Sequence, residues 1–193
     1  MTDRAVRPLD QSTWPAFAAL VEGCGGYPTG CWCMAFHPEG VAKVGKASDA
    51  ELNQQRKRDR VASGAAHAAL VFDGDECVGW CQFGPPDELP RIKSAAAYRK
   101  ELSVLPDWRI TCFFVAKGHR RQGVSSEALS GALDLIAEAG GGVVEGYPEP
   151  AGAVPAGFLF NGALSTYEQL GFERDRMIGK HRWVMRRQVD ASR

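Results

Sequence analysis

Short apolar runs rich in β-branched and aromatic residues alternate along this chain with longer stretches of helical periodicity, a pattern typical of a mixed α/β protein. The clearest run, Ile110 to Val115, predicts a buried strand, and the apolar positions that follow from Val124 to Ile136 recur at helical spacing. Asp73-Gly74 between two apolar runs predicts a hairpin turn. The strands are expected at residues 5–9, 68–72, 77–83, 110–115, 143–147 and 182–186. The helices are expected at about 14–22, 49–63, 95–102, 124–139 and 163–170.

The order β-α-α-β-β-β-α-β-α-β predicts an α/β (α+β) architecture in which helices cover both faces of a mixed, mainly antiparallel twisted sheet. Asp10 or Ser12 is expected to cap the first helix, and Ser48 or Asp49 the second. A chain of 193 residues suits one well-packed domain, expected to span 1–193, since neither a repeat nor a linker interrupts the pattern.

Charge narrows the possible partners. The chain has 23 basic and 23 acidic residues, which argues against a general nucleic-acid binder. The run Arg56-Lys57-Arg58, broken by Asp59, is interpreted as a solvated helix face. Neither a signal peptide nor an apolar run of about 18 residues is present, so we expect a cytoplasmic protein without a membrane partner.

Six cysteines include one tight pair, Cys31 and Cys33. A metal site would need a second pair or nearby histidines at regular spacing, so packed reduced thiols are favoured over zinc and no metal is expected. A modified or redox-active Cys31 or Cys33 remains an alternative.

The turn after the strand at 110–115 is basic and contains glycine, and it opens a helix. A helix start has unpaired N–H groups and the positive end of the helix dipole, so this turn predicts a phosphate site, with Arg120 and Arg121 as further donors. The glycine spacing fits neither a Walker A loop nor the dinucleotide fingerprint.

Arg120-x-x-Gly123-x-Ser125 resembles the acyl-CoA pyrophosphate loop of the GNAT superfamily of N-acyltransferases, with Ser125 in place of the usual small apolar residue. A second segment, Tyr167 to Phe172 (Tyr-Glu-Gln-Leu-Gly-Phe), is similar to the Tyr-Glu-x-Leu-Gly-Phe segment of that family and follows one strand later. The resemblance runs from residue 5 to about 187 and implies a GNAT-like fold with acetyl-CoA as cosubstrate.

The resemblance also implies site residues. A backbone N–H of the strand would meet the thioester carbonyl, and the loop would surround the pyrophosphate. The implied acetyl-CoA contacts are Phe113, Phe114, Val115, Arg120, Arg121, Gln122, Gly123, Val124, Ser125 and Ser126.

Tyr167 is the implied general acid for the leaving sulfur, with packing on the sheet as its alternative. Glu145, on the strand after the long helix, is the candidate general base, and a buried structural carboxylate is equally compatible with its position. His119 is expected to face solvent or phosphate. His37, His67 and His181 have no supporting partner in the sequence, and Asn161 lies one residue out of the family's register, so it receives no role.

Segments 23–47 and 84–108 are expected to set substrate specificity, because loops on a rigid sheet carry variable recognition. We expect Trp80 mainly in the core, whereas Trp32 fits core and pocket equally. The sequence therefore predicts an N-acetyltransferase that transfers acetyl directly to a primary amine of a small molecule. A catalytically silent CoA-binding sensor and a thiol or metal-binding protein using Cys31 and Cys33 are the alternatives, and homodimer formation stays open.

Overall fold

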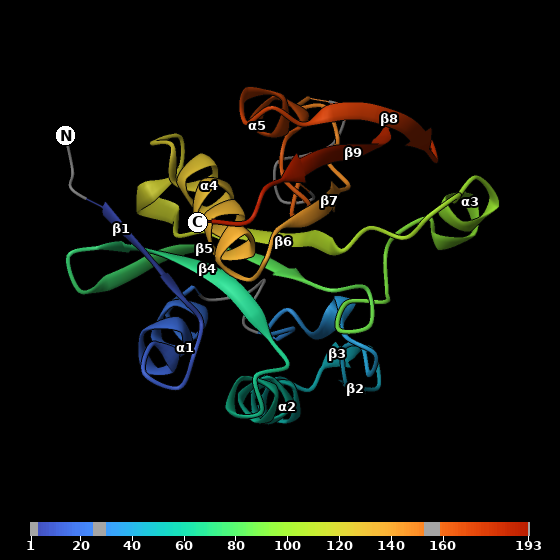
Figure 1. Ribbon diagram of the computed structural model, residues 1–193. Coiled ribbons are helices and arrows are strands. Elements are labelled where there is room, and N and C mark those ends of the chain that lie inside the picture. Colours follow the sequence, from blue (N-terminus) through green and yellow to red (C-terminus); the bar gives the residue numbers. More distant parts are fainter. Residues whose placement is uncertain (1–3, 25–29, 153–158, 193) are drawn as a thin grey trace.

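A seven-stranded twisted sheet forms the centre of the protein (Figure 1), whose computed structural model describes residues 4–24, 30–152 and 159–192. The order of strands across the sheet is β1-β4-β5-β6-β7-β9-β8. These strands are β1 (Arg4–Pro8), β4 (His67–Asp73), β5 (Glu76–Gly84), β6 (Trp108–Val115), β7 (Gly142–Gly146), β8 (Glu173–Ile178) and β9 (Arg182–Val189). A separate small hairpin consists of β2 (Lys43–Val44) and β3 (Ala47–Ser48).

Helices lie on both sides of the sheet, with α4 on one side and α1 and α2 on the other (Figure 1). The helical elements are α1 (Trp14–Gly23), η1 (Met34–Phe36), α2 (Ala50–Ala62), α3 (Ala95–Lys100), η2 (Lys117–His119), α4 (Val124–Glu138) and α5 (Leu164–Gln169). The predicted mixed, mainly antiparallel architecture is confirmed.

One parallel pair interrupts the antiparallel sheet. β6 and β7 run parallel and pair only from Trp108 opposite Val144 to Ile110 opposite Gly146. Beyond Ile110, β6 continues for five residues along β5, whereas β7 ends. The C-terminal end of β6 therefore has an edge that does not pair with β7. Two strands that separate in this way leave room for a ligand between them.

Two apolar clusters hold the layers together. One joins α4 and α5 to the sheet and includes Leu129, Ile136 and Phe172; the other joins α1 and η1 to the opposite face and includes Phe17, Met34 and Trp80. Burying side chains of this size contributes about 1.5–3 kcal/mol each.

Two expectations about local structure need correction. The first helix begins at Trp14, after Thr13, and the Asp10 carboxylate instead accepts the N–H groups of Ser12 and Thr13 in the preceding turn. Asp49 does cap α2, accepting from Leu52 N–H at 3.0 Å. Strand β8 was not predicted, because its polar sequence at the sheet edge has no regular apolar alternation.

Lys57 also departs from expectation. It was placed on a solvated helix face, but only 1% of it is exposed, and its Nζ lies 3.0 Å from His37 Nε2. Its neighbours Arg56 and Arg58 do face outward to different degrees, so the basic run is one buried lysine between two more exposed arginines.

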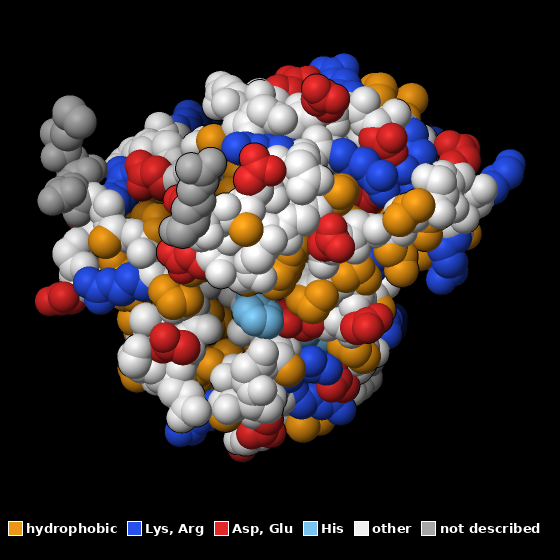
Figure 2. Space-filling model, viewed as in Figure 1, with side chains coloured by type: hydrophobic (Ala, Val, Ile, Leu, Met, Phe, Trp, Pro, Cys, Tyr) orange, Lys and Arg blue, Asp and Glu red, His pale blue; other side chains and the backbone are white. Residues whose placement is uncertain are grey.

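Basic and acidic side chains are interspersed on the face seen in Figure 2, with the basic ones most crowded over β8 and β9. Among the described residues, none of the helices has the length and apolar character needed to cross a bilayer.

Candidate active site

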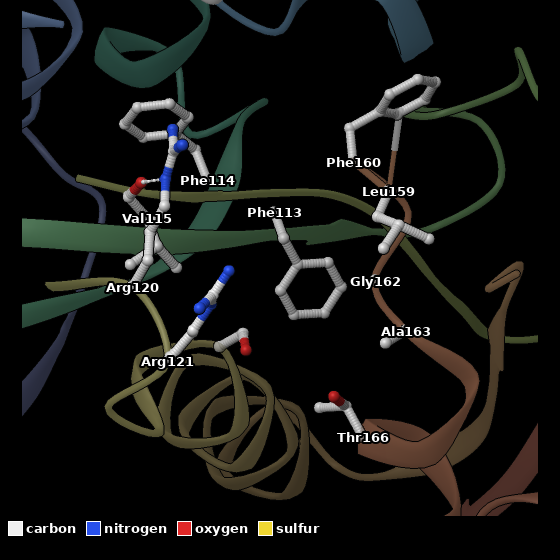
Figure 3. A pocket seen from close by; sticks show the side chains of 11 residues that line it. Phe113, Phe114, Val115, Arg120, Arg121, Leu159, Phe160, Gly162, Ala163 and Thr166 are labelled. Atoms are coloured by element: carbon white, nitrogen blue, oxygen red, sulfur yellow. Dashed lines mark hydrogen bonds between the residues drawn. The ribbon is translucent and has the colours of Figure 1, made fainter. Parts of the chain in front are cut away.

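A cavity of about 340 Å³ lies at the end of β6, between that strand, the start of α4 and the segment that leads into α5 (Figure 3). Phe113 projects into its middle, with Arg121 on the α4 side and Ala163 and Thr166 opposite. The lining consists of Phe113, Phe114, Val115, Arg120, Arg121, Ser125, Leu159, Phe160, Gly162, Ala163 and Thr166.

The open edge of β6 supplies backbone groups to this cavity. Ala116 N–H donates to Val78 in β5, and because ladder bonds alternate along an antiparallel strand, Phe113 and Val115 direct theirs to the open side. Phe113 N–H donates to Phe160 C=O at 2.6 Å, whereas Val115 N–H has no acceptor among the described residues. The edge thus presents one free donor and one donor already holding a carbonyl oxygen.

The loop before α4 has the backbone shape of an anion site. Arg121 and Gly123 both have positive φ, 62° and 85°, and the arginine adopts this strained conformation without the freedom of glycine. Among the described residues, the N–H groups of Gly123, Val124 and Ser125 find no acceptor. They lie at the positive end of the 15-residue helix α4, a position that favours bound phosphate.

Two arginines border this loop in different ways. Arg120 Nε donates to Val115 C=O at 3.2 Å, which ties the loop to the end of β6 (Figure 3). The Arg121 side chain points into the cavity and has no hydrogen bond or ion pair within the described part of the chain. A free guanidinium beside unpaired N–H groups is the arrangement that binds a phosphate.

Arg4 holds the same loop from the far end of the chain. Its guanidinium donates to Gln122 C=O at 2.9 Å, to Gln122 Oε1 at 3.2 Å and to Glu127 Oε1 at 2.8 Å. Only 6% of the Arg4 side chain is exposed. Sequence reasoning missed this residue, because nothing local distinguishes an arginine that makes its contacts 118 positions away.

The structure brings six of the ten predicted cofactor contacts to the cavity wall: Phe113, Phe114, Val115, Arg120, Arg121 and Ser125. The side chains of the other four do not line it: Gln122, Gly123, Val124 and Ser126. Gln122 Nε2 instead donates to Gly118 C=O, and Val124 is buried beneath the sheet, where a Cβ on Gly79 would approach it to 2.7 Å. The sequence did not reveal five further lining residues, which lie just before or within the recognised tyrosine region: Leu159, Phe160, Gly162, Ala163 and Thr166.

Tyr167 lies behind the cavity wall. Its side chain has no exposed surface, its ring packs 6.1 Å from the Phe113 ring, and its hydroxyl donates to Asn161 C=O at 3.0 Å. Gly146 leaves the space that the ring occupies, since any Cβ there would overlap it. Burial raises the pKa of Tyr167 well above the ordinary value. The role of general acid stays a prediction, and the contacts favour the alternative of packing.

Glu145 is fully buried and surrounded by donors. Its Oε2 accepts from Tyr98 at 2.7 Å and from Tyr147 at 3.0 Å, and its Oε1 pairs with Arg186 at 2.6 Å. Desolvation, followed by the carboxylate, raises the pKa of Tyr98. Glu145 is absent from the cavity lining, so its role as general base also stays a prediction, while these contacts support a structural carboxylate.

His37 has partners that the sequence did not reveal. Its Nδ1 lies 3.2 Å from Glu88 C=O, which can only accept, so Nδ1 carries the proton and Nε2 is the acceptor. Lys57 Nζ at 3.0 Å and Gln82 Nε2 at 3.1 Å both approach Nε2. Burial first, and the charge of Lys57 second, lower the pKa of His37 to about 2. This neutral imidazole joins η1, α2, β5 and the segment after β5.

Three other side chains are now placed. Trp32 and Trp80 are both buried in the core, 2% and 1% exposed, which supports the core interpretation for Trp32 as well as for Trp80. His67 also has a partner, Glu88, at 2.6 Å. All six cysteines are free thiols, and no group of three or more metal-binding side chains occurs within the described ranges.

A sequence model of the Acetyltransferase (GNAT) family matches residues 27–148. Solved structures share the fold. An arylalkylamine N-acetyltransferase-like protein, 5b, from mosquito is 11% identical with a TM-score of 0.58, covering 97% of this chain and 100% of its own. A Corynebacterium glutamicum protein described as histone acetyltransferase HPA2 and related acetyltransferase is 18% identical with a TM-score of 0.57, covering 100% and 98%.

The yncA protein of Salmonella typhimurium, solved with its cofactor acetyl-CoA, is 15% identical with a TM-score of 0.54, covering 97% of this chain and 94% of its own. No curated protein sequence matches significantly. The family match covers more than half of the residues and includes both β6 and the loop before α4. This chain belongs to the GNAT family of acetyltransferases.

Proposed function

We propose that this protein is an N-acetyltransferase that transfers the acetyl group of acetyl-CoA directly to a primary amine of a small molecule. The observation that carries the proposal is the continuity of two binding elements. Unpaired N–H groups at the start of α4 stand beside the open edge of β6, and one cavity joins them.

The residues present fit acetyl-CoA. Its pyrophosphate would lie against the N–H groups of Gly123 to Ser125, with Arg121 as the charged partner. Its pantetheine arm would follow the edge of β6, where Val115 N–H is free to pair with an amide. Phe113 and Phe160 would surround the thioester end.

Acyl transfer needs a donor at the carbonyl oxygen, on which negative charge develops. Phe113 N–H is the donor at the thioester end, and Phe160 C=O, 2.6 Å away, marks where an accepting oxygen sits. We place the thioester oxygen in that position, which requires Phe160 C=O to move away from Phe113 N–H when acetyl-CoA binds. Acetyl-CoA supplies the activated acyl group: a C–N bond forms, the C–S bond breaks, the amine loses a proton and the thiolate gains one.

The test measures acetyl-CoA binding by thermal shift and CoA thiol release across a panel of primary amines. Arg121→Gln should raise the acetyl-CoA Kd about tenfold, the expected cost of one charge-assisted contact. Arg58→Gln, which removes an exposed arginine on α2, is the matched control. Acetyl-CoA binding that both variants leave unchanged would remove this cavity from the proposal.

One observation favours a silent CoA-binding sensor as the second candidate: neither Tyr167 nor Glu145 faces the cavity. Direct transfer does not require either side chain, since water can carry the two protons. The same assay separates the candidates, because stabilisation by acetyl-CoA without thiol release for any amine supports the sensor.

A further inference from the structure

Four segments meet at the thioester end of the cavity, outside the wall formed by Phe160. The Phe36 ring lies 6.3 Å from the Phe160 ring, and Lys93 Nζ lies 4.1 Å from it. The turn between β8 and β9 also reaches this place, because a Cβ on Gly179 would lie 3.1 Å from Ser94 Oγ. The remaining segment is the one after β7, which contains Glu149.

Glu149 is attached directly to the cavity wall through its backbone. It forms a parallel bridge with Ala163, a lining residue, and Leu164 N–H donates to Glu149 C=O at 3.1 Å. Its carboxylate accepts from Arg182 at 2.9 Å, and the two side chains are only 14% and 6% exposed. This ion pair therefore lies just outside the cavity wall at Ala163, in an outer layer that we call the rim.

Lys93 adds an unbalanced positive charge to that rim. The pair Arg182 and Glu149 is neutral overall, so these three side chains carry a net charge of +1. Lys93 has no ion pair among the described residues, and its contact there is the Phe160 ring. The buried Arg182 Nε likewise has no hydrogen-bond partner within the described ranges. Neither Lys93 nor Arg182 lines the cavity itself; Lys93 lies against the lining residue Phe160, and Arg182 is paired with Glu149 beside the lining residue Ala163. Unused donors of one sign this close to a binding cavity favour an acidic group.

The backbone beside Lys93 is strained in a way that fixes its position. Ser94 has a φ of 58°, a left-handed conformation that costs a non-glycine residue about 1–3 kcal/mol and persists only when its surroundings hold it. Desolvation first, and Arg182 second, lower the pKa of Lys93, while Glu149 opposes them.

We propose that Lys93, with Arg182 beside it, binds a carboxylate of the acceptor, so that the substrate is an amine that also carries an acidic group, as an amino acid does. This inference rests on the proposed N-acetyltransferase function. The same charges would repel a polyamine, since each additional ammonium group would face Lys93 without a free carboxylate to balance it.

The test compares amino acids with their decarboxylated amines. One pair is phenylalanine and phenethylamine. A graded series is glutamate, 4-aminobutyrate and propylamine, which lose one carboxylate at each step. We expect a higher kcat/KM for the compound with more carboxylate. Lys93→Gln should raise KM for amino acids about tenfold and leave kcat and the KM of phenethylamine and propylamine, which have no carboxylate, unchanged. Lys100→Gln, on the exposed end of α3, is the control.

The outcomes separate this inference from the function beneath it. Two results would overturn the carboxylate-binding role of Lys93 without touching the proposed function. One is acetyl-CoA binding with better turnover of the decarboxylated amines than of the amino acids. The other is acetyl-CoA binding without turnover of any amino acid. An equal effect of Lys93→Gln on phenylalanine and phenethylamine also overturns this role. Failure to bind acetyl-CoA overturns the proposed function and this inference with it.

Discussion

Acidification should destabilise this protein through His37 before most carboxylates titrate. His37 is fully buried, and its neutral form is held by Glu88 C=O at Nδ1 and by Lys57 at Nε2. Burial, then the charges of Lys57 and Arg60, then His67, lower its pKa to about 2, and the Glu88 carbonyl opposes them. The unfolded chain has no such environment, so its histidine titrates near the ordinary value of about 6.5.

The sign follows from proton uptake. Below about pH 6.5 the unfolded state binds a proton that the native imidazole refuses, so stability is complete above that pH and is lost as the pH falls toward 2. The loss is about 1.4 kcal/mol at pH 5.5 and about 2.7 kcal/mol at pH 4.5. Against a total stability of about 5–15 kcal/mol, this is a measurable fraction.

The assay is urea unfolding of the wild type and of His37→Gln between pH 7.5 and 4.5. An amide can keep one donor and one acceptor at this position without titrating. The wild type should lose about 2.7 kcal/mol relative to the variant over this interval, because all other titrating groups are common to both. His181→Gln, which removes an exposed histidine, is the control and should follow the wild type. Parallel curves for the wild type and His37→Gln would refute the reasoning.

Three further substitutions test the site. Arg4→Ala should raise the acetyl-CoA Kd about fivefold, because two hydrogen bonds to Gln122 in the loop and one to Glu127 in α4 are lost. Arg7→Ala on the same strand should leave the Kd measured by titration calorimetry unchanged. Tyr167→Phe should lower the free energy of unfolding by about 1 kcal/mol for the lost bond to Asn161 and change turnover less than threefold; a tenfold fall in turnover at unchanged stability would identify a general acid. Glu145→Gln should cost about 3 kcal/mol in thermal unfolding, because Arg186 loses its buried partner, and loss of the acidic limb of the pH–rate profile would instead identify the general base.

The sheet and its main helices could be predicted because they depend on patterns within a few residues. The run 110–115 became β6, the helix predicted from Val124 became α4, and Asp73-Gly74 became the turn between β4 and β5. β8 has a different origin. Its sequence, Glu-Arg-Asp-Arg-Met-Ile, has little strand character by itself, and pairing with β9 determines its conformation.

The phosphate loop was predictable for the same reason, since its chemistry lies within one turn and one helix start. The rest of the site depends on contacts between distant positions. Arg4 reaches Gln122 across 118 residues, and Phe160 reaches Phe113 across 47 positions of sequence. Nothing in the local pattern around either residue indicates such a partner.

Buried polar groups show why residue type alone misleads. Lys57 follows Arg56 in a basic run, yet it is buried because His37 Nε2 offers an acceptor for its ammonium group. A buried polar group requires partners, and those of His37 come from three separate segments, which contain Lys57, Gln82 and Glu88. Glu145 illustrates the converse. Its place on β7 is compatible with a general base. Its carboxylate is nevertheless surrounded by tyrosine and arginine donors, and these contacts favour a structural role. The proposed acetyl-CoA contacts are largely backbone groups, so under this proposal side-chain identity matters most at the acceptor end of the cavity. The positive charge of Lys93, which has no ion pair among the described residues, is the feature of that end from which we infer an acidic acceptor.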